Sequence, residues 1–262
     1  MSIKELSTFL FGHYGKIIIS VPCFVFGLGA RADLDLSTRA YYRSYPLSGF
    51  VEASSGYGLL LYGSAGSPFS GYIRPAIEGA VTSGYYSSLA KLEFFPLAIM
   101  GVRGGVESVH NDADYSAFDC TVADCKGQFH RGFLESELTL GAGPLFVQGR
   151  WRREHWTQNT ARVGEFVEPT SGLLMTNEGE YQTVWQGIGG VKFDPAWSFM
   201  GGLRYAEGES GVSRLSFGFL RWHHEGFTLA VGGGAFDSEL KKREATILTY
   251  FTWDIIPSLA LK

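Results

Sequence analysis

The sequence predicts an all-β protein, a transmembrane antiparallel up-and-down barrel of about twelve strands. Three observations lead to this prediction: charged and apolar side chains alternate along many segments, these segments are long, and the connections between them differ in length from one end to the other. A tilted strand that crosses a bilayer needs roughly 9–11 residues, whereas strands of soluble proteins average about 5–6. The candidate segments have the length expected of membrane-spanning strands.

The alternation is clearest from Leu145 to Glu154. Arg150, Arg152 and Glu154 fall on one face of a strand, while Leu145 and Trp151 fall on the other, because successive side chains leave a strand on opposite sides. A soluble sheet would bury the apolar face in a core. A membrane barrel would turn that face to lipid and the charges to the lumen.

The composition agrees with a β-rich chain. Aromatic residues make up 15%, charged residues 18%, and there are 35 glycines in 262 residues. A net charge of −4 gives no reason to expect a nucleic-acid partner.

The N-terminal segment predicts an export signal. Lys4 and Lys16 precede an apolar stretch over 17–29, and Ala30-Arg31-Ala32 then offers a small-residue cleavage site. We expect cleavage after Ala32, so that 1–32 is the signal peptide and 33–262 the barrel. The alternative is an uncleaved anchor helix, although the stretch is short for a membrane span.

Twelve candidate strands follow one another along the mature region. They cover 33–45, 50–63, 71–82, 87–95, 98–109, 129–141, 145–157, 181–193, 197–206, 212–223, 227–237 and 246–257.

The connections predict two different ends of the barrel. Tight turns are expected at 96–97, 142–144, 194–196 and 224–226, and long loops at 110–128, 158–180 and 238–245. Short periplasmic turns and longer extracellular loops are typical of outer-membrane barrels. The connection at 64–70 is longer than this pattern requires, and those at 46–49 and 83–86 are shorter.

The parity of each strand predicts which side chains line the lumen. Basic residues outnumber acidic ones on this face, which indicates a slight preference for anions. The predicted lumen residues are Arg39, Arg43, Glu52, Arg74, Glu78, Lys91, Glu93, Arg103, Glu107, Arg131, Glu135, Glu137, Arg150, Arg152, Glu154, Arg204 and Arg214, with Lys192 and Asp254 as further members. The opposite, lipid-facing side is predicted to carry apolar residues throughout, Leu215, Phe217 and Phe219 among them. Arg153 and Arg221 are the exceptions on it, near strand ends.

On these features the mature region, 33–262, resembles a Gram-negative outer-membrane β-barrel. The resemblance is one of architecture and names no subfamily. It implies outer-membrane lipid and lipopolysaccharide around the barrel, and the barrel-assembly machinery as a partner. One departure is the C-terminus: such barrels usually end on an aromatic residue, and this chain ends Leu259-Ala260-Leu261-Lys262.

The loop 110–128 holds Cys120 and Cys125, which are predicted to form a disulfide because an exported protein meets an oxidising compartment. Asp112, Asp114 and Asp119 offer oxygen ligands of the kind calcium accepts. The calcium-loop pattern is incomplete, so we expect a solvated acidic loop with no metal and no cofactor.

Catalysis is a minor alternative. A lipase-type site needs a serine beside a histidine that a third group orients, and no such motif stands in the sequence. The candidates for a hydrolase at the rim are His110, His155 and Asp112. The main hypothesis is therefore a non-enzymatic narrow pore for small polar solutes. The alternatives are a closed structural or adhesive barrel that binds a partner through loops 110–128 and 158–180, and an exported soluble β-sandwich.

Overall fold

The computed structural model describes most of the chain after the predicted signal peptide. The described residues are 32–45, 47–82, 84–112, 120, 123–159, 164–168, 171–176, 178–238 and 241–256. The predicted signal peptide and its cleavage site lie almost wholly outside this part of the chain. Within it, no helix is long and apolar enough to cross a membrane.

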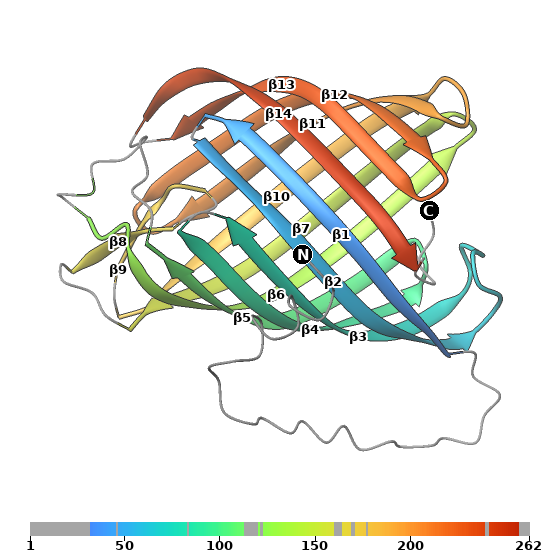
Figure 1. Ribbon diagram of the computed structural model, residues 1–262, viewed down its shortest axis with the longest axis horizontal. Helices are drawn as coiled ribbons and strands as arrows, with labels where there is room; N and C mark the ends of the chain where they lie inside the picture. The colour runs from blue at the N-terminus through green and yellow to red at the C-terminus, as the bar shows by residue number, and fades with distance from the viewer. Residues whose placement is uncertain are drawn as a thin grey trace, which may run out of the picture. The chain divides into compact units, whose positions relative to one another are not determined.

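Twelve long strands form one closed antiparallel barrel, and a short hairpin forms a separate two-stranded sheet (Figure 1). The barrel strands are β1 (Ala32–Ser44), β2 (Leu47–Tyr62), β3 (Gly71–Thr82), β4 (Tyr85–Leu97), β5 (Met100–Asn111), β6 (Gly127–Ala142), β7 (Leu145–Gln158), β10 (Glu180–Lys192), β11 (Trp197–Gly208), β12 (Gly211–His224), β13 (Phe227–Ser238) and β14 (Lys241–Ile256). The hairpin consists of β8 (Glu165–Val167) and β9 (Leu174–Thr176).

Each barrel strand pairs with its neighbours in sequence, and β1 pairs with β14 to close the sheet. β7 pairs directly with β10, so the hairpin is an insertion between two adjacent strands. Closure removes the unpaired strand edges that would otherwise expose backbone groups to lipid. The predicted fold class is correct, and so is the expected number of barrel strands.

Most connections follow the prediction, but the long loop expected at 238–245 is wrong: β13 ends at Ser238 and β14 begins at Lys241, so most of this segment extends β14. At the end where β1 begins, which we call the short-turn end, the β12–β13 turn is made by Glu225 and Gly226 alone. Both residues have positive φ, 45° and 86°, which is the requirement of a two-residue hairpin turn that matches the twist of its strands. At the opposite, long-loop end lie the connection from β5 to β6 and the one from β7 to β10, which contains the hairpin.

The polarity of the barrel is inverted relative to a soluble protein. Large apolar side chains such as Ile77, Val106 and Leu203 are exposed on the outside, while Glu135 and Glu154 are buried inside. An apolar outer face and a charged interior are what a lipid environment selects. Aromatic residues such as Trp253 are exposed on the outer face near the short-turn end. This is the expected position for rings at a membrane–water interface, where aromatic side chains are enriched.

Strand β12 corrects the sequence prediction. Leu215 lies directly opposite Arg204 and Phe236, and Phe236 is fully buried inside the barrel. Leu215, Phe217 and Phe219 therefore face the interior, whereas Arg214 lies opposite Tyr205 on the outer face and its guanidinium lies over the Tyr205 ring.

The whole strand is thus turned by one residue relative to the expectation, so Arg221 also faces inward, opposite the buried Ser198. The reason is that β12 has apolar residues on both parities, so a one-residue shift moves every side chain to the other face with little change in pattern. Glycine on the neighbouring strand leaves space for these aromatic rings inside the barrel, because a Cβ at Gly202 would lie only 2.9 Å from the Phe217 ring.

Candidate functional site: the barrel lumen

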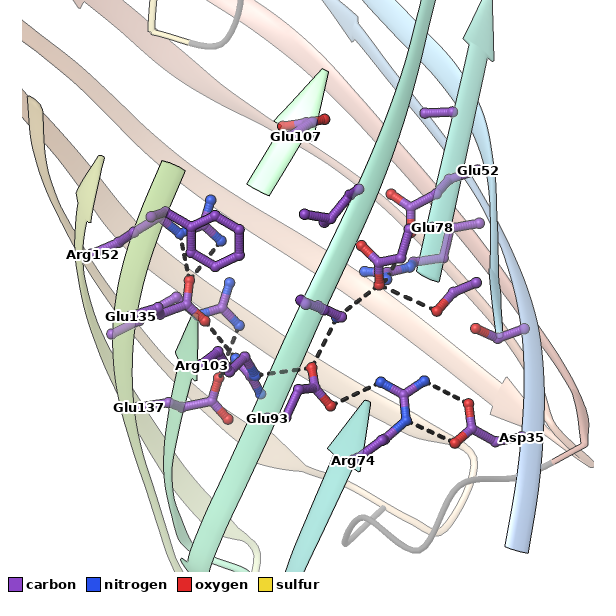
Figure 2. Close-up of a pocket in the computed structure, with 18 of the residues that line it drawn as sticks. Asp35, Glu52, Arg74, Glu78, Glu93, Arg103, Glu107, Glu135, Glu137 and Arg152 are labelled. Carbon is purple, nitrogen blue, oxygen red and sulfur yellow. Dashed lines mark hydrogen bonds and ion pairs between the residues drawn. The ribbon is translucent and has the colours of Figure 1, made fainter. Parts of the chain in front are cut away.

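The interior of the barrel contains a cavity of about 670 Å³ lined mainly by β1 to β7. It extends from Ile99 and Ile256, near the short-turn end, to Glu107 and Trp156, towards the long-loop end. Most of the predicted lumen residues line it: Arg39, Glu52, Arg74, Glu78, Lys91, Glu93, Arg103, Glu107, Arg131, Glu135, Glu137, Arg150 and Arg152. Figure 2 shows many of them pointing into the same space.

The remaining predicted residues are placed differently. Glu154 is buried in the same wall and bonds to its arginines, and Arg43 and Arg204 face the interior nearer the long-loop end. Arg214 is outside, as described above, and its assignment to the lumen is wrong.

Arg74 is the centre of one group of ion pairs. Its guanidinium donates to both carboxylate oxygens of Asp35, at 2.7 and 2.5 Å, and through Nη1 to Glu93 at 2.8 Å (Figure 2). Such a two-pronged contact matches the fork of a guanidinium to the carboxylate. Three strands, β1, β3 and β4, are joined by this one side chain.

Lys91 and Arg39 extend the group along the wall. The Lys91 ammonium lies 2.7 Å from Glu78 and 2.8 Å from Glu93, and Arg39 lies 2.7 Å from Glu52 and 3.2 Å from Glu78. Each cation contacts two carboxylates, so the charges form a chain across β1 to β4 instead of isolated pairs.

Glu135 is the centre of a second group of ion pairs. Arg103 Nη1 approaches it at 2.5 Å, Arg152 Nη2 at 2.6 Å and Arg150 Nε at 3.5 Å. Arg103 and Arg150 also contact Glu137, at 2.7 and 3.1 Å. Three guanidiniums from β5 and β7 therefore converge on two carboxylates of β6.

The network ends at Arg131, which pairs with Glu107 and lies 3.0 Å from Glu154. Trp156 donates its indole N–H to Glu154 at 2.9 Å, so this buried carboxylate is held from both sides. Buried charges need such partners, because an isolated ion in the interior carries a desolvation penalty of several kcal/mol.

Three arginines are more exposed to the cavity than the carboxylates they contact. Side-chain exposure is 37% for Arg39, 31% for Arg150 and 25% for Arg152, against 1% for Glu135 and 2% for Glu154. The other cations of this wall are exposed by 10–18%, which is close to the 15% of Glu52 and the 11% of Glu137. The exposed positive charge is therefore concentrated on three side chains.

The long-loop end of the interior is filled by apolar side chains. Phe166 and Met175 of the hairpin, with Leu173 between its strands, pack against inward-facing residues of β5, β6, β7, β10 and β11. These wall residues are Val109, Phe129, Trp156, Val184 and Ala206. Since the partners come from five strands and all are buried, the hairpin sits within the mouth of the barrel. We call the described residues 164–168 and 171–176 the plug.

The predicted disulfide between Cys120 and Cys125 is present, with an S–S distance of 2.06 Å. Cys125 and Ala123 pack on Val167 of the plug, and Asp124 forms a β-bridge with Phe166. The loop that carries the disulfide is therefore attached to the plug by both backbone and side-chain contacts.

Of the candidate metal and hydrolase residues that the structure describes, His110 and Asp112 are brought into contact. Asp114 and Asp119 lie outside the described residues, and among the described ones no three potential ligands cluster. His110 contacts Asp112 at 3.0 Å but stacks on Tyr86 on the outer face, and the His155 ring lies against Tyr181. The sequence-based reasoning missed the plug, whose two three-residue strands are too short to show an alternation.

No protein-family model matches the chain, and no curated protein matches it by sequence. Among solved structures it is similar to an outer membrane channel from Pseudomonas putida F1, at 12% identity over 84% of this chain and 95% of that chain, with a TM-score of 0.53. The NanC porin follows at 10% identity over 83% and 98%, TM-score 0.43, and the KdgM porin in complex with disordered oligogalacturonate at 8% over 85% and 99%, TM-score 0.43. The first likeness establishes the fold, that of the outer-membrane β-barrels. The other two are too weak to add to it.

Proposed function

We propose that the chain is an integral outer-membrane barrel that forms a narrow channel for small polar solutes, with a preference for anions. The observation that carries the proposal is the charged cavity, in which the guanidiniums of Arg39, Arg150 and Arg152 are more exposed than the carboxylates they contact. Twelve strands leave more room than the filled interior of about eight, and less than the wide channel of 16–18. The role is transport and involves no covalent chemistry.

The proposed environment of the barrel is the outer membrane. The exposed apolar band is suited to outer-membrane lipid and lipopolysaccharide, and insertion of such a barrel requires the barrel-assembly machinery. Export through the predicted signal peptide would bring the chain there.

Reconstitution of the purified barrel in planar bilayers tests this function. We expect discrete conductance steps and a reversal potential that favours anions in a salt gradient. Arg152→Gln should lower the anion-over-cation permeability ratio by roughly two-fold or more, because it removes an exposed lumen charge. Arg153→Gln is the matched control, since the neighbouring Arg153 lies over the Tyr181 ring on the outer face. Folded protein that never conducts, with or without the plug, would refute the pore.

A second function is favoured by one observation, the plug. In this second function the plug closes the barrel, and the barrel binds a partner at its long-loop end. The binding surface would be formed by the plug and the disulfide-bonded loop, which pack together there. A version lacking residues 164–176 distinguishes the two functions. If it conducts while the full chain stays silent, the barrel is a channel that the plug closes; if it stays silent as well, the closed barrel is favoured.

A further inference from the structure

The outer face of β2 to β6 carries a groove that a channel through the lumen does not use. It has a volume of about 860 Å³ and lies among the exposed apolar residues of the outer band. Its floor consists of four small residues, each directly opposite the next, namely Ala53, Gly79, Ser88 and Ser108. These residues face outward, because the neighbouring residue in each strand lines the lumen.

Larger side chains on both sides turn this floor into a groove. Towards the long-loop end it is flanked by a second row of directly paired residues, namely Val51, Val81, Tyr86 and His110. On the other side, Ile77 and Val106 are among the most exposed apolar residues of the outer face. The groove therefore follows the direction of strand pairing, across the strands.

The groove is inclined relative to the membrane. The floor row continues from Ala53 through Thr38 to Trp253, near the short-turn end, and in the other direction to His130 and Thr157, which stands next to the last residue of β7. Such a row climbs because the strands of a barrel are tilted against its axis (Figure 1). From β2 to β6 the groove thus rises out of the apolar band towards the rim at the long-loop end.

The upper end of the groove is rich in hydrogen-bond donors. His130 lines it, and the side-chain amide of Asn159 donates to His130 Nε2 at 2.8 Å. His110 and His155 stand diagonally to His130 on β5 and β7, and diagonal neighbours in a sheet are about 7–8 Å apart. His110 also contacts Asp112 at 3.0 Å, so His130 and His155 are the donors best placed for an external acceptor. Imidazole and amide N–H groups both donate to phosphate oxygens.

We propose that this groove binds one molecule of lipopolysaccharide. An acyl chain lies along the four small residues, and a phosphate of the headgroup accepts hydrogen bonds from His130 and His155. An apolar floor that descends from a donor-rich rim matches a lipid whose headgroup stays at the interface while its chain enters the membrane. The phosphate-bearing lipid of the leaflet beside the long loops is lipopolysaccharide. The site rests on the outer-membrane placement in the proposed function and is independent of conduction.

Native mass spectrometry of the folded full-length barrel in detergent, with added lipid A that carries both phosphates, tests the site. We expect Ser108→Leu to lower the lipid-bound fraction several-fold, because leucine fills the floor beside His130. An apolar side chain on the lipid-facing surface is compatible with the fold. Ser216→Leu is the matched control, since Ser216 faces outward from β12, opposite the exposed Leu203, and should leave the bound fraction unchanged.

The headgroup contact is tested by His130→Ala and by lipid A without phosphates. Removal of the phosphates should weaken binding to the original chain several-fold and should have little further effect on His130→Ala. Phosphatidylglycerol, which also carries a phosphate and acyl chains, should be retained less than lipid A.

Three results would overturn the proposal. They are equal retention of lipid A by the original chain and Ser108→Leu, equal retention of lipid A with and without phosphates, and retention of phosphatidylglycerol as strong as that of lipid A. Heat-modifiable mobility on gels shows that each variant is folded, and Ser88→Leu fills the same floor from β4 if Ser108→Leu does not fold.

Conductance separates this proposal from the proposed function. A barrel that retains lipid A as expected but never conducts, with or without the plug, refutes the channel and leaves the lipid site standing. A conducting barrel that retains no lipid A refutes the lipid site and leaves the channel standing.

Discussion

At the scale of single residues, the lumen is organised by carboxylates that each serve several cations. Glu135 is the clearest case, because it is almost fully buried and receives guanidiniums from Arg103, Arg150 and Arg152. Its position on β6 was predictable from parity. Its three partners were not, since they depend on the reach of long side chains across two strand pairs.

Removing this carboxylate should destabilise the barrel more than an exposed one. We expect Glu135→Ala to lower the free energy of unfolding by about 1.5–3 kcal/mol, because three guanidiniums each lose one carboxylate partner. Denaturant unfolding in detergent micelles or vesicles measures this. Glu165→Ala, at an exposed site, should change the free energy by less than about 0.5 kcal/mol. Equal losses in the two variants would mean that the network contributes no more than a surface charge.

At the scale of elements, the hairpin β8–β9 changes what the barrel can do. It carries too few residues to bury an apolar face by itself, and its stability comes from the ring of wall residues and from the disulfide-bonded loop. A strand pair of this length is marginal without such support. The plug is therefore an element whose position depends on contacts at both of its sides.

Loss of the disulfide should loosen the plug and leave the barrel folded. For a loop this short, the chain-entropy account gives the disulfide about 2 kcal/mol, which acts on the loop that holds the hairpin. In the double variant Cys120→Ser, Cys125→Ser we expect a larger open fraction in bilayer recordings and an unchanged heat-modifiable mobility on gels. A reducing agent should reproduce the effect in the original chain and have none in the variant. An open fraction that both treatments leave unaltered would show that the disulfide does not anchor the plug.

At the scale of the whole molecule, the barrel is stabilised by putting its apolar side chains where lipid lies and its charges where water or other charges lie. The exposed residues form the outer band, and the ion pairs fill the wall from β1 to β7. The opposite wall, from β11 to β13, has mainly apolar, small and glycine residues on its inner face, together with Arg204 and Arg221. The two sides of the lumen therefore differ in charge.

The depth of the membrane band is testable by two arginine substitutions. Val106, in the middle of β5, and Leu145, beside a short turn, are both exposed on the outer face. We expect Val106→Arg to cost about 2–4 kcal/mol of folding free energy and Leu145→Arg about 0–1 kcal/mol, because a charge is penalised most at the midplane of the bilayer. Refolding equilibria in lipid vesicles give both values. A larger loss at Leu145 than at Val106 would contradict this placement of the band.

Alternation along the chain determined the closed barrel, the number of its strands and the inner face of most of them. This was possible because the side-chain direction in a strand is a local property with a period of two. The tertiary structure alone decided the facing of β12, where both parities are apolar, and the ion-pair partners, which depend on register. It also decided that part of the loop between β7 and β10 folds into the mouth. Burial of Phe166 and Glu168 requires five distant strands to be in place, and no local pattern records contacts of that kind.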